Sequence, residues 1–146
     1  MQYSSVVSAV FVKRVNRFVA HVLLDSALEV VHVKNTGRCA ELLVPGCTVW
    51  LAPGTGASRK TKYDLVAAGK GNMLINMDSM APNTAAKEWL LQGGLYPFSL
   101  LKPEYTLGNS RFDFYGESPF GRHLIEVKGC TLENDGIACF PDAPTL

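Results

Sequence analysis

The chain has 146 residues, 47% of them hydrophobic and 18% charged, which supports a packed core and excludes a disordered polypeptide. Its net charge of +1 combines nine Lys or Arg against four Asp or Glu up to residue 70 (+5) with five against nine from residue 71 onward (−4). The two halves are compatible with two modules that bind different partners, or with two ordinary solvated surfaces.

No segment is suited to entering a membrane. The apolar runs stop far short of the ~20 residues that a spanning helix needs. No basic segment leads into an apolar one at the start, so we expect no secretory signal, a cytoplasmic location and no membrane partner. The four cysteines form no C-x-x-C pair, and no histidine lies at ligand spacing from them. This pattern disfavours a zinc site and predicts reduced thiols.

The first half of the chain is rich in short β-strands. Stretches dense in Val, Phe and Leu predict them at residues 6–12, 17–24, 28–33, 48–52 and 63–67. Five short strands over so few residues are typical of a small closed barrel, for which the five-stranded OB-fold is the first candidate. We place this OB-like domain at residues 1–69.

Basic residues gather in the loops that follow the first and fourth predicted strands. In an OB-fold, oligonucleotides lie against these same loops and the strand 2–3 face. Cations there would neutralise phosphates and give salt-dependent binding. Two alternatives stay open. Solvent-exposed loops are commonly charged without any binding role, and the loops of such barrels can also bind proteins or sugars. The candidate nucleic-acid-binding residues in the two loops are Lys13, Arg14, Arg17, Arg59, Lys60 and Lys62.

The pattern changes after a glycine-rich hinge at residues 69–71, where we begin a second domain, residues 70–146. Residues 84–91 predict a helix that has an Asn or Thr cap, stops at two glycines and anchors the core through Trp89. Extended segments follow at residues 102–107, 111–115 and 122–128. A helix followed by antiparallel strands predicts an α+β element.

The last two extended segments predict a hairpin that carries a candidate site. A symmetric turn would place Asp113 directly opposite Glu126, with Cβ atoms ~5 Å apart. Facing carboxylates repel unless a cation lies between them, and Mg²⁺ is commonly held by one or two carboxylates with waters and phosphate. Lys128 would orient the attacking water or stabilise charge on the phosphate. The group therefore predicts Mg²⁺- or Mn²⁺-dependent phosphodiester hydrolysis, unless a register slip or a plain solvated edge explains it.

Several segments together resemble the sugar fermentation stimulation protein A (SfsA) family. They lie at residues 33–38, 60–63, 75–76, 111–114, 125–128 and 140–145. The resemblance implies an N-terminal OB-like domain and a C-terminal domain similar to the PD-(D/E)xK nucleases. The family is described as DNA-binding, with a role in regulating sugar (maltose) metabolism.

The resemblance also implies residue roles. Asp113, Glu126 and Lys128 match the nuclease-like motif, so they are the candidate catalytic residues, with Asp113 and Glu126 as metal ligands. Glu104 matches a further acidic position that would help hold the metal, or is a surface glutamate. Family members continue past the last matching segment with a long helix and further elements, so we expect a fragment or a shortened gene. The resemblance adds to the nucleic-acid-binding candidates Lys34, Asn35 and Arg38.

The expected fold is thus α+β, an N-terminal five-stranded OB-like β-barrel followed by a truncated PD-(D/E)xK nuclease-like α/β domain. The leading functional hypothesis is a Mg²⁺- or Mn²⁺-dependent nuclease that binds DNA or RNA. The alternative is a non-catalytic DNA-binding regulator of sugar metabolism, in which the acidic hairpin is structural. The sequence leaves the oligomeric state open, a dimer included.

Overall fold

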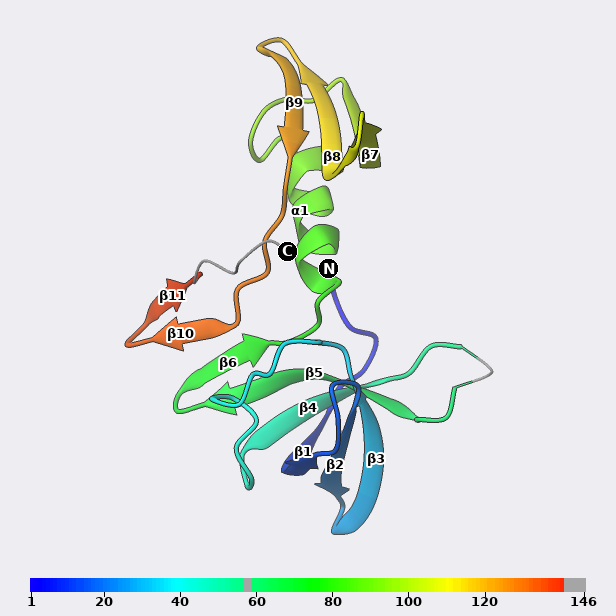
Figure 1. Cartoon of the computed structure of the whole chain (residues 1–146), viewed down its shortest axis with the longest axis vertical. Coiled ribbons are helices and arrows are strands. Elements are labelled where there is room, and N and C mark those ends of the chain that lie inside the picture. The colour runs from blue at the N-terminus through cyan, green and yellow to red at the C-terminus, as the bar shows by residue number, and fades with distance from the viewer. Residues whose placement is uncertain (57–58, 141–146) are drawn as a thin grey trace. The chain divides into compact units, whose positions relative to one another are not determined.

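The structure, a computed structural model, describes residues 1–56 and 59–140. These residues divide into two compact units (Figure 1). The barrel unit contains residues 2–79 and 130–140, and the sheet unit contains Met1 and residues 80–129. Of the family-like segment at residues 140–145, only Phe140 lies within the described part.

The barrel unit is built on one sheet that closes on itself. Its strands are β1 (Val7–Arg14), β2 (Val19–Leu24), β3 (Ala27–Val33), β4 (Thr48–Pro53), β5 (Tyr63–Lys70) and β6 (Met73–Asn76). They follow the order β3-β2-β1-β4-β5-β6, and a parallel contact between β3 and β5 closes the first five strands into a barrel. The predicted five-stranded OB-like barrel is therefore confirmed, with every strand close to its predicted place.

Alternation along the strands fills the barrel with aliphatic side chains. Because successive residues of a strand point to opposite faces, Ala20 and Val22 of β2 and Val31 and Val33 of β3 are buried while their neighbours are not. Leu42, from the segment between β3 and β4, and Met77, after β6, complete the core. The fully buried strand residues include Val22, Val31, Val49, Leu51 and Leu65.

The glycine-rich hinge predicted at residues 69–71 is the end of β5 and the start of the tight turn into β6. Gly71 adopts φ +58°, a left-handed conformation that suits a glycine in a turn. β6 pairs along β5 from Lys70↔Met73 to Ala67↔Asn76, so residues 70–79 lie in the barrel unit. The sequence-based boundary falls inside this hairpin, because four mostly exposed residues give no clear strand pattern.

A second small hairpin also belongs to the barrel unit. It consists of β10 (Leu132–Asn134) and β11 (Ile137–Cys139). Lys70 ties it to the end of β5, since its Nζ donates to the backbone oxygen of Glu133 at 2.5 Å and to Oε2 at 2.8 Å. The sequence-based second domain included these residues, whereas the structure groups residues 130–140 with the barrel.

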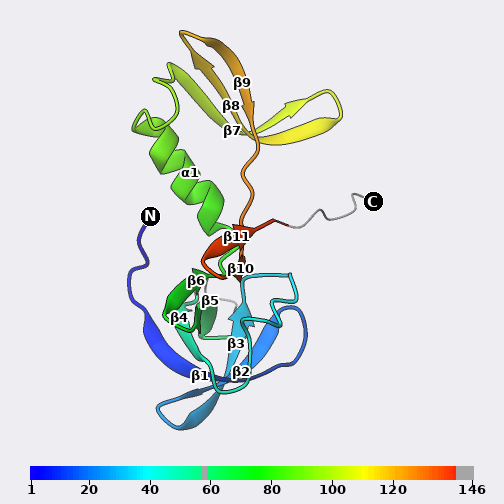
Figure 2. The ribbon, with the colours of Figure 1, turned by 90° about the vertical axis from the view of Figure 1, so that its left-hand side faces the viewer.

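The sheet unit contains one helix and a three-stranded antiparallel sheet. The elements are α1 (Ala81–Leu91), β7 (Leu100–Leu107), β8 (Ser110–Ser118) and β9 (Gly121–Ile125), with strand order β7-β8-β9 (Figure 2). The predicted α+β character is confirmed. No helix within the described ranges is long and apolar enough to span a membrane.

The start of α1 differs from the prediction. Its N-cap is Met80, no side chain caps it, and Pro82 lies in the first turn, where its missing N–H costs nothing. Asn83 donates to Asp113 at 2.7 Å, and Thr84 donates back to the Met80 carbonyl at 3.2 Å. The predicted Asn or Thr cap is therefore wrong, because both side chains have other partners.

Helix α1 ends at the predicted glycines, but Trp89 is not the core anchor that the sequence predicted. Gly93 follows the C-cap with φ +80°, the left-handed conformation that commonly ends a helix. Trp89 is 51% exposed and its ring lies against Gly94, where a Cβ atom would approach it to 2.1 Å. Leu90, not Trp89, is the buried residue of this turn.

Candidate metal site and nucleic-acid interface

β8 and β9 form the hairpin on which the predicted metal site depends. They pair from the turn to Phe114↔Ile125, in a register symmetric about the two turn residues, as the sequence predicted. β9 ends there, so the predicted strand ran three residues too far. The next step of the same register holds Asp113 on β8 and Glu126 just beyond β9.

The ladder stops because the side chain of Asp113 takes the place of a backbone acceptor. Its Oδ2 accepts the backbone N–H of Val127 at 2.7 Å, and its Oδ1 accepts the amide of Asn83 at 2.7 Å. Asp113 is half-buried between these two partners. Since a carboxylate has about four acceptor positions, both oxygens keep capacity for a further ligand. Asp113 is thus held in one orientation by α1 and by the strand end.

Glu126 and Lys128 are exposed and paired with each other. Lys128 Nζ lies 2.5 Å from Glu126 Oε1. The hydrogen bond to Glu126 raises the pKa of Lys128, so the lysine stays a cation through neutral pH. This charge state suits the stabilisation of a phosphate and does not suit proton abstraction.

Glu104 lies on β7, on the side of Asp113 opposite to Glu126. The β7–β8 ladder keeps one register on both sides of these two residues, so they stand at the same step. Glu104 has φ +53°, which interrupts the ladder there, and its Oε1 pairs with Arg111 Nη2 at 2.7 Å. The three predicted carboxylates therefore occupy one row across the sheet, which we call the carboxylate row, with side chains that face different partners.

The carboxylate row suits a hard cation by its chemistry. Within residues 1–56 and 59–140, no three His, Cys, Asp or Glu side chains stand close enough to hold a metal ion as they are placed. The partners of Glu104 and Glu126 are exposed, and surface ion pairs contribute little to stability. Releasing either glutamate from its partner therefore costs little. Oxygen ligands of this kind are those that Mg²⁺ and Ca²⁺ prefer.

The predicted nucleic-acid-binding residues of the barrel fall into two groups, and Arg14 leads the first. Its guanidinium donates to five backbone carbonyls at 2.5–3.1 Å. These carbonyls lie in the β1–β2 loop and in the segment after β3, so Arg14 fastens the two segments together. The acceptors belong to Asn16, Arg17, Asn35, Gly37 and Arg38.

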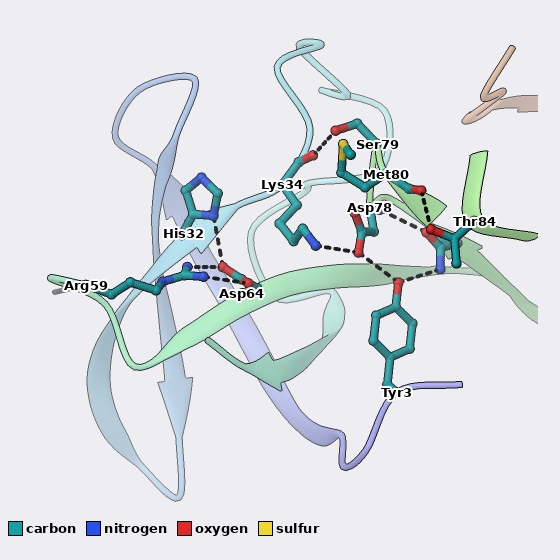
Figure 3. Close-up of polar contacts among 10 residues, drawn as sticks. Tyr3, His32, Lys34, Arg59, Asp64, Asp78, Ser79, Met80 and Thr84 are labelled. Atoms are coloured by element: carbon teal, nitrogen blue, oxygen red, sulfur yellow. Dashed lines mark hydrogen bonds and ion pairs between the residues drawn. The ribbon is translucent and has the colours of Figure 1, made fainter. Parts of the chain in front are cut away.

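Arg59 also contacts the fold, through the buried Asp64. Figure 3 shows the Asp64 carboxylate between Arg59 and His32. Arg59 donates to both carboxylate oxygens, one at 3.0 Å, and His32 Nδ1 lies 2.9 Å from Oδ1. Burial acts to raise the pKa of Asp64, but the hydrogen bonds from Arg59 and His32 outweigh it and hold the pKa below its usual value.

Lys34 has a comparable partner in Asp78, which is also buried (Figure 3). Lys34 Nζ lies 2.7 Å from Asp78 Oδ2, and the hydroxyl of Tyr3 donates to the same oxygen at 3.2 Å. Burial is the main cause that raises the pKa of Tyr3. Asn35 Oδ1 accepts the backbone N–H of Gly37 at 2.8 Å and so shapes its own turn.

Sequence reasoning missed these acidic partners. Asp64 begins the apolar run of β5, and an acidic residue at the edge of such a run is the signal that could have identified it. Asp78 follows the buried Met77 in the same way.

The remaining predicted cations are exposed. Arg17 lies over the ring of Phe18 at 5.8 Å, and Phe18 is 47% exposed. The carbonyl of Phe18 accepts the N–H of Val33, which lies at the contact between β3 and β5. Arg59 reaches the same contact through Asp64, so both basic loops border the β3–β5 seam. The exposed cations are Lys13, Arg17, Arg38, Lys60 and Lys62.

Two family models match the chain in succession. Residues 12–77 match the SfsA N-terminal OB domain. Residues 80–146 match the sugar fermentation stimulation protein RE domain.

Known proteins match over the whole length of the chain. A sugar fermentation stimulation protein homolog from Desulfitobacterium hafniense is 52% identical over 99% of this chain and 64% of its own length. One from Ruminiclostridium cellulolyticum is 50% identical over 99% of this chain and 65% of its own length. The chain therefore spans just under two thirds of these curated relatives.

A solved structure described as Pyrococcus furiosus SfsA in complex with Ca²⁺ is also similar. It has a TM-score of 0.84 and 28% sequence identity, and the match covers 100% of this chain and 64% of that one.

Proposed function

The chain belongs to the sugar fermentation stimulation protein family, and on that premise we propose that it binds nucleic acid and hydrolyses phosphodiester bonds with a divalent cation. The observation that carries this proposal is the carboxylate row. Glu104, Asp113 and Glu126 stand at one step across β7, β8 and the end of β9. A shared cation would offset the repulsion that arises when these three side chains turn toward one another.

A relative supports the choice of cation. The Pyrococcus furiosus protein is described in complex with Ca²⁺, a hard cation that takes carboxylate oxygens. Mg²⁺ prefers the same donors but keeps several waters, so one or two carboxylates are enough to hold it. Asp113 and Glu126 would be these ligands here, with Glu104 as a third.

Each residue at the carboxylate row would have its own role in hydrolysis. A bound cation would polarise the scissile phosphate and lower the pKa of a water molecule. Asp113 is already oriented by Asn83 and Val127. When Glu126 turns toward the row, Lys128 loses its carboxylate partner and becomes available to the phosphate. A lysine released in this way is still a cation at neutral pH, so it would stabilise charge that develops on the phosphate.

The barrel would supply affinity for the phosphate backbone. Exposed cations stand in both loops that border the β3–β5 seam, and Phe18 offers an exposed ring beside Arg17. Cations of this kind bind phosphates in a salt-dependent way, and an exposed ring accepts a stacked base. The bound molecule would be DNA or RNA.

Metal-dependent cleavage tests the proposal. Single- and double-stranded DNA and RNA are incubated with the chain in Mg²⁺, in Mn²⁺ and in EDTA. We expect cleavage only with metal, and we expect Asp113→Asn and Lys128→Ala to abolish it. Asp25→Asn, which alters an exposed carboxylate in the β2–β3 turn, is the matched control and should cleave as the wild type does. Equal cleavage by all four proteins would refute the assignment.

A non-catalytic DNA-binding regulator, with a role in sugar (maltose) metabolism, is the second candidate. The observation that favours it is that both oxygens of Asp113 already bind within the fold. The effect of Mg²⁺ on the unfolding temperature distinguishes the nuclease from the regulator, because a ligand that binds only the folded state raises the unfolding temperature of the protein. A nuclease should show such a rise in the wild type and none in Asp113→Asn. No rise in the wild type, with lower stability of Asp113→Asn, would favour the regulator.

A further inference from the structure

Two stacked tyrosines lie beside the carboxylate row. The rings of Tyr105 on β7 and Tyr115 on β8 are 4.5 Å apart between centroids, with planes at 23°. Tyr115 is two residues from Asp113 on one strand, so the two side chains share a face of the sheet. Tyr105 follows Glu104 directly. The positive φ of Glu104 interrupts the regular alternation of β7, and the contact with Tyr115 places the Tyr105 ring on the face that carries Asp113.

This face of the sheet is polar. Arg111, Asp113 and Glu117 share it with Tyr115, because they alternate along β8. The buried Phe114 points to the other face. Both tyrosines are half-buried, so part of the stack stays open to solvent. Cross-strand aromatic pairs stabilise sheets, and this half-buried pair also keeps ring surface open for a further contact.

Tyr115 lies between two exposed cations, and its hydroxyl makes one hydrogen bond. Lys102 lies opposite Tyr115 in the β7–β8 ladder, and Arg122 lies opposite Glu117 in the β8–β9 ladder. The hydroxyl of Tyr115 donates to Glu117 Oε1 at 2.5 Å. The ring is thus fixed at its tip, while Lys102 and Arg122 offer positive charge on either side of it.

We propose that Tyr105 and Tyr115 form a stacking platform for an unpaired nucleobase, which sets the adjoining phosphate at the carboxylate row. The inference rests on the proposed function and deepens it, because it names single-stranded nucleic acid as the substrate class. A paired base has both faces covered within a duplex, whereas an unpaired base can stack on a ring whatever its identity. Two residues along β8 span ~7 Å, within reach of one nucleotide.

Binding of a single strand and of its duplex tests the platform. A fluorescent oligothymidylate and its duplex with oligoadenylate are titrated with the chain in Ca²⁺, and affinity is read by anisotropy. We expect the wild type to favour the single strand, and Tyr115→Leu to weaken single-strand binding about tenfold while leaving the duplex unchanged. Tyr115→Phe keeps the ring and should keep the affinity.

Tyr96→Leu is the matched control, because it removes a ring that stacks with His123 and not with Tyr115. Tyr115→Trp gives a second readout: saturating oligothymidylate should quench the added fluorescence, and an abasic oligonucleotide of equal length should not. Equal loss for single strand and duplex in Tyr115→Leu, or equal quenching by both oligonucleotides, would overturn the platform.

These results also separate the platform from the nuclease. Base-dependent binding without cleavage would leave the platform standing and refute hydrolysis. Cleavage that does not respond to Tyr115→Leu would refute the platform alone.

Discussion

Replacing Arg14 by Ala should destabilise the barrel, although the sequence places Arg14 among the loop cations that bind phosphate. Its guanidinium donates to five carbonyls in two segments of the chain. Alanine removes every one of these donors. Lysine would restore only a point charge with three donors, which cannot match the planar fork of arginine.

The magnitude follows from the contacts. A hydrogen bond contributes about 0.5–1.5 kcal/mol net, and the lower part of this range applies here because most of these carbonyls can bind water instead. Five such bonds give about 3 kcal/mol in total. At roughly 4–8 °C per kcal/mol for a domain of this size, we expect the unfolding temperature to fall by about 15 °C.

Urea denaturation followed by circular dichroism measures the loss, and Lys13→Ala is the matched control. Lys13 is the exposed neighbour of Arg14 on β1, so its removal should leave the urea midpoint unchanged. It should instead flatten the dependence of log affinity on log salt by about one unit. The reasoning would be refuted if Arg14→Ala kept the wild-type midpoint and flattened the salt dependence as Lys13→Ala does.

Two further predictions separate binding from stability in the β4–β5 loop and on β5. Lys60→Ala and Lys62→Ala should each flatten the dependence of log affinity on log salt for oligonucleotide binding by about one unit. Arg59→Ala should mainly lower the urea midpoint, because Arg59 pairs with Asp64. The reverse pattern would contradict a structural role of the Arg59–Asp64 contact. Because the pKa of Asp64 is lower in the folded state than its usual 3.8, its contribution is present above that value and lost as the pH falls through the folded pKa. A urea midpoint that falls below pH 4 in the wild type and falls less in Asp64→Asn would agree, and identical pH profiles would not.

The sequence by itself determined the elements that depend on neighbouring residues. Alternating aliphatic residues specify the five strands of the barrel, since a strand shows every second residue to the core. The turn between β8 and β9 specifies the register as far as Phe114↔Ile125, because a short turn leaves the two strands one way to pair. The row that Asp113 shares with Glu126 could be predicted for the same reason.

Only the tertiary structure decided which polar side chains are free. Arg14 and Lys13 are adjacent in sequence and alike in charge, yet the acceptors of Arg14 reach as far as Arg38. The local sequence predicts Asn83 as a helix cap, but its side chain donates to Asp113, thirty residues away. A hydrogen-bond partner is set by the meeting of distant segments and by their burial, and neither is contained in a local pattern of residues.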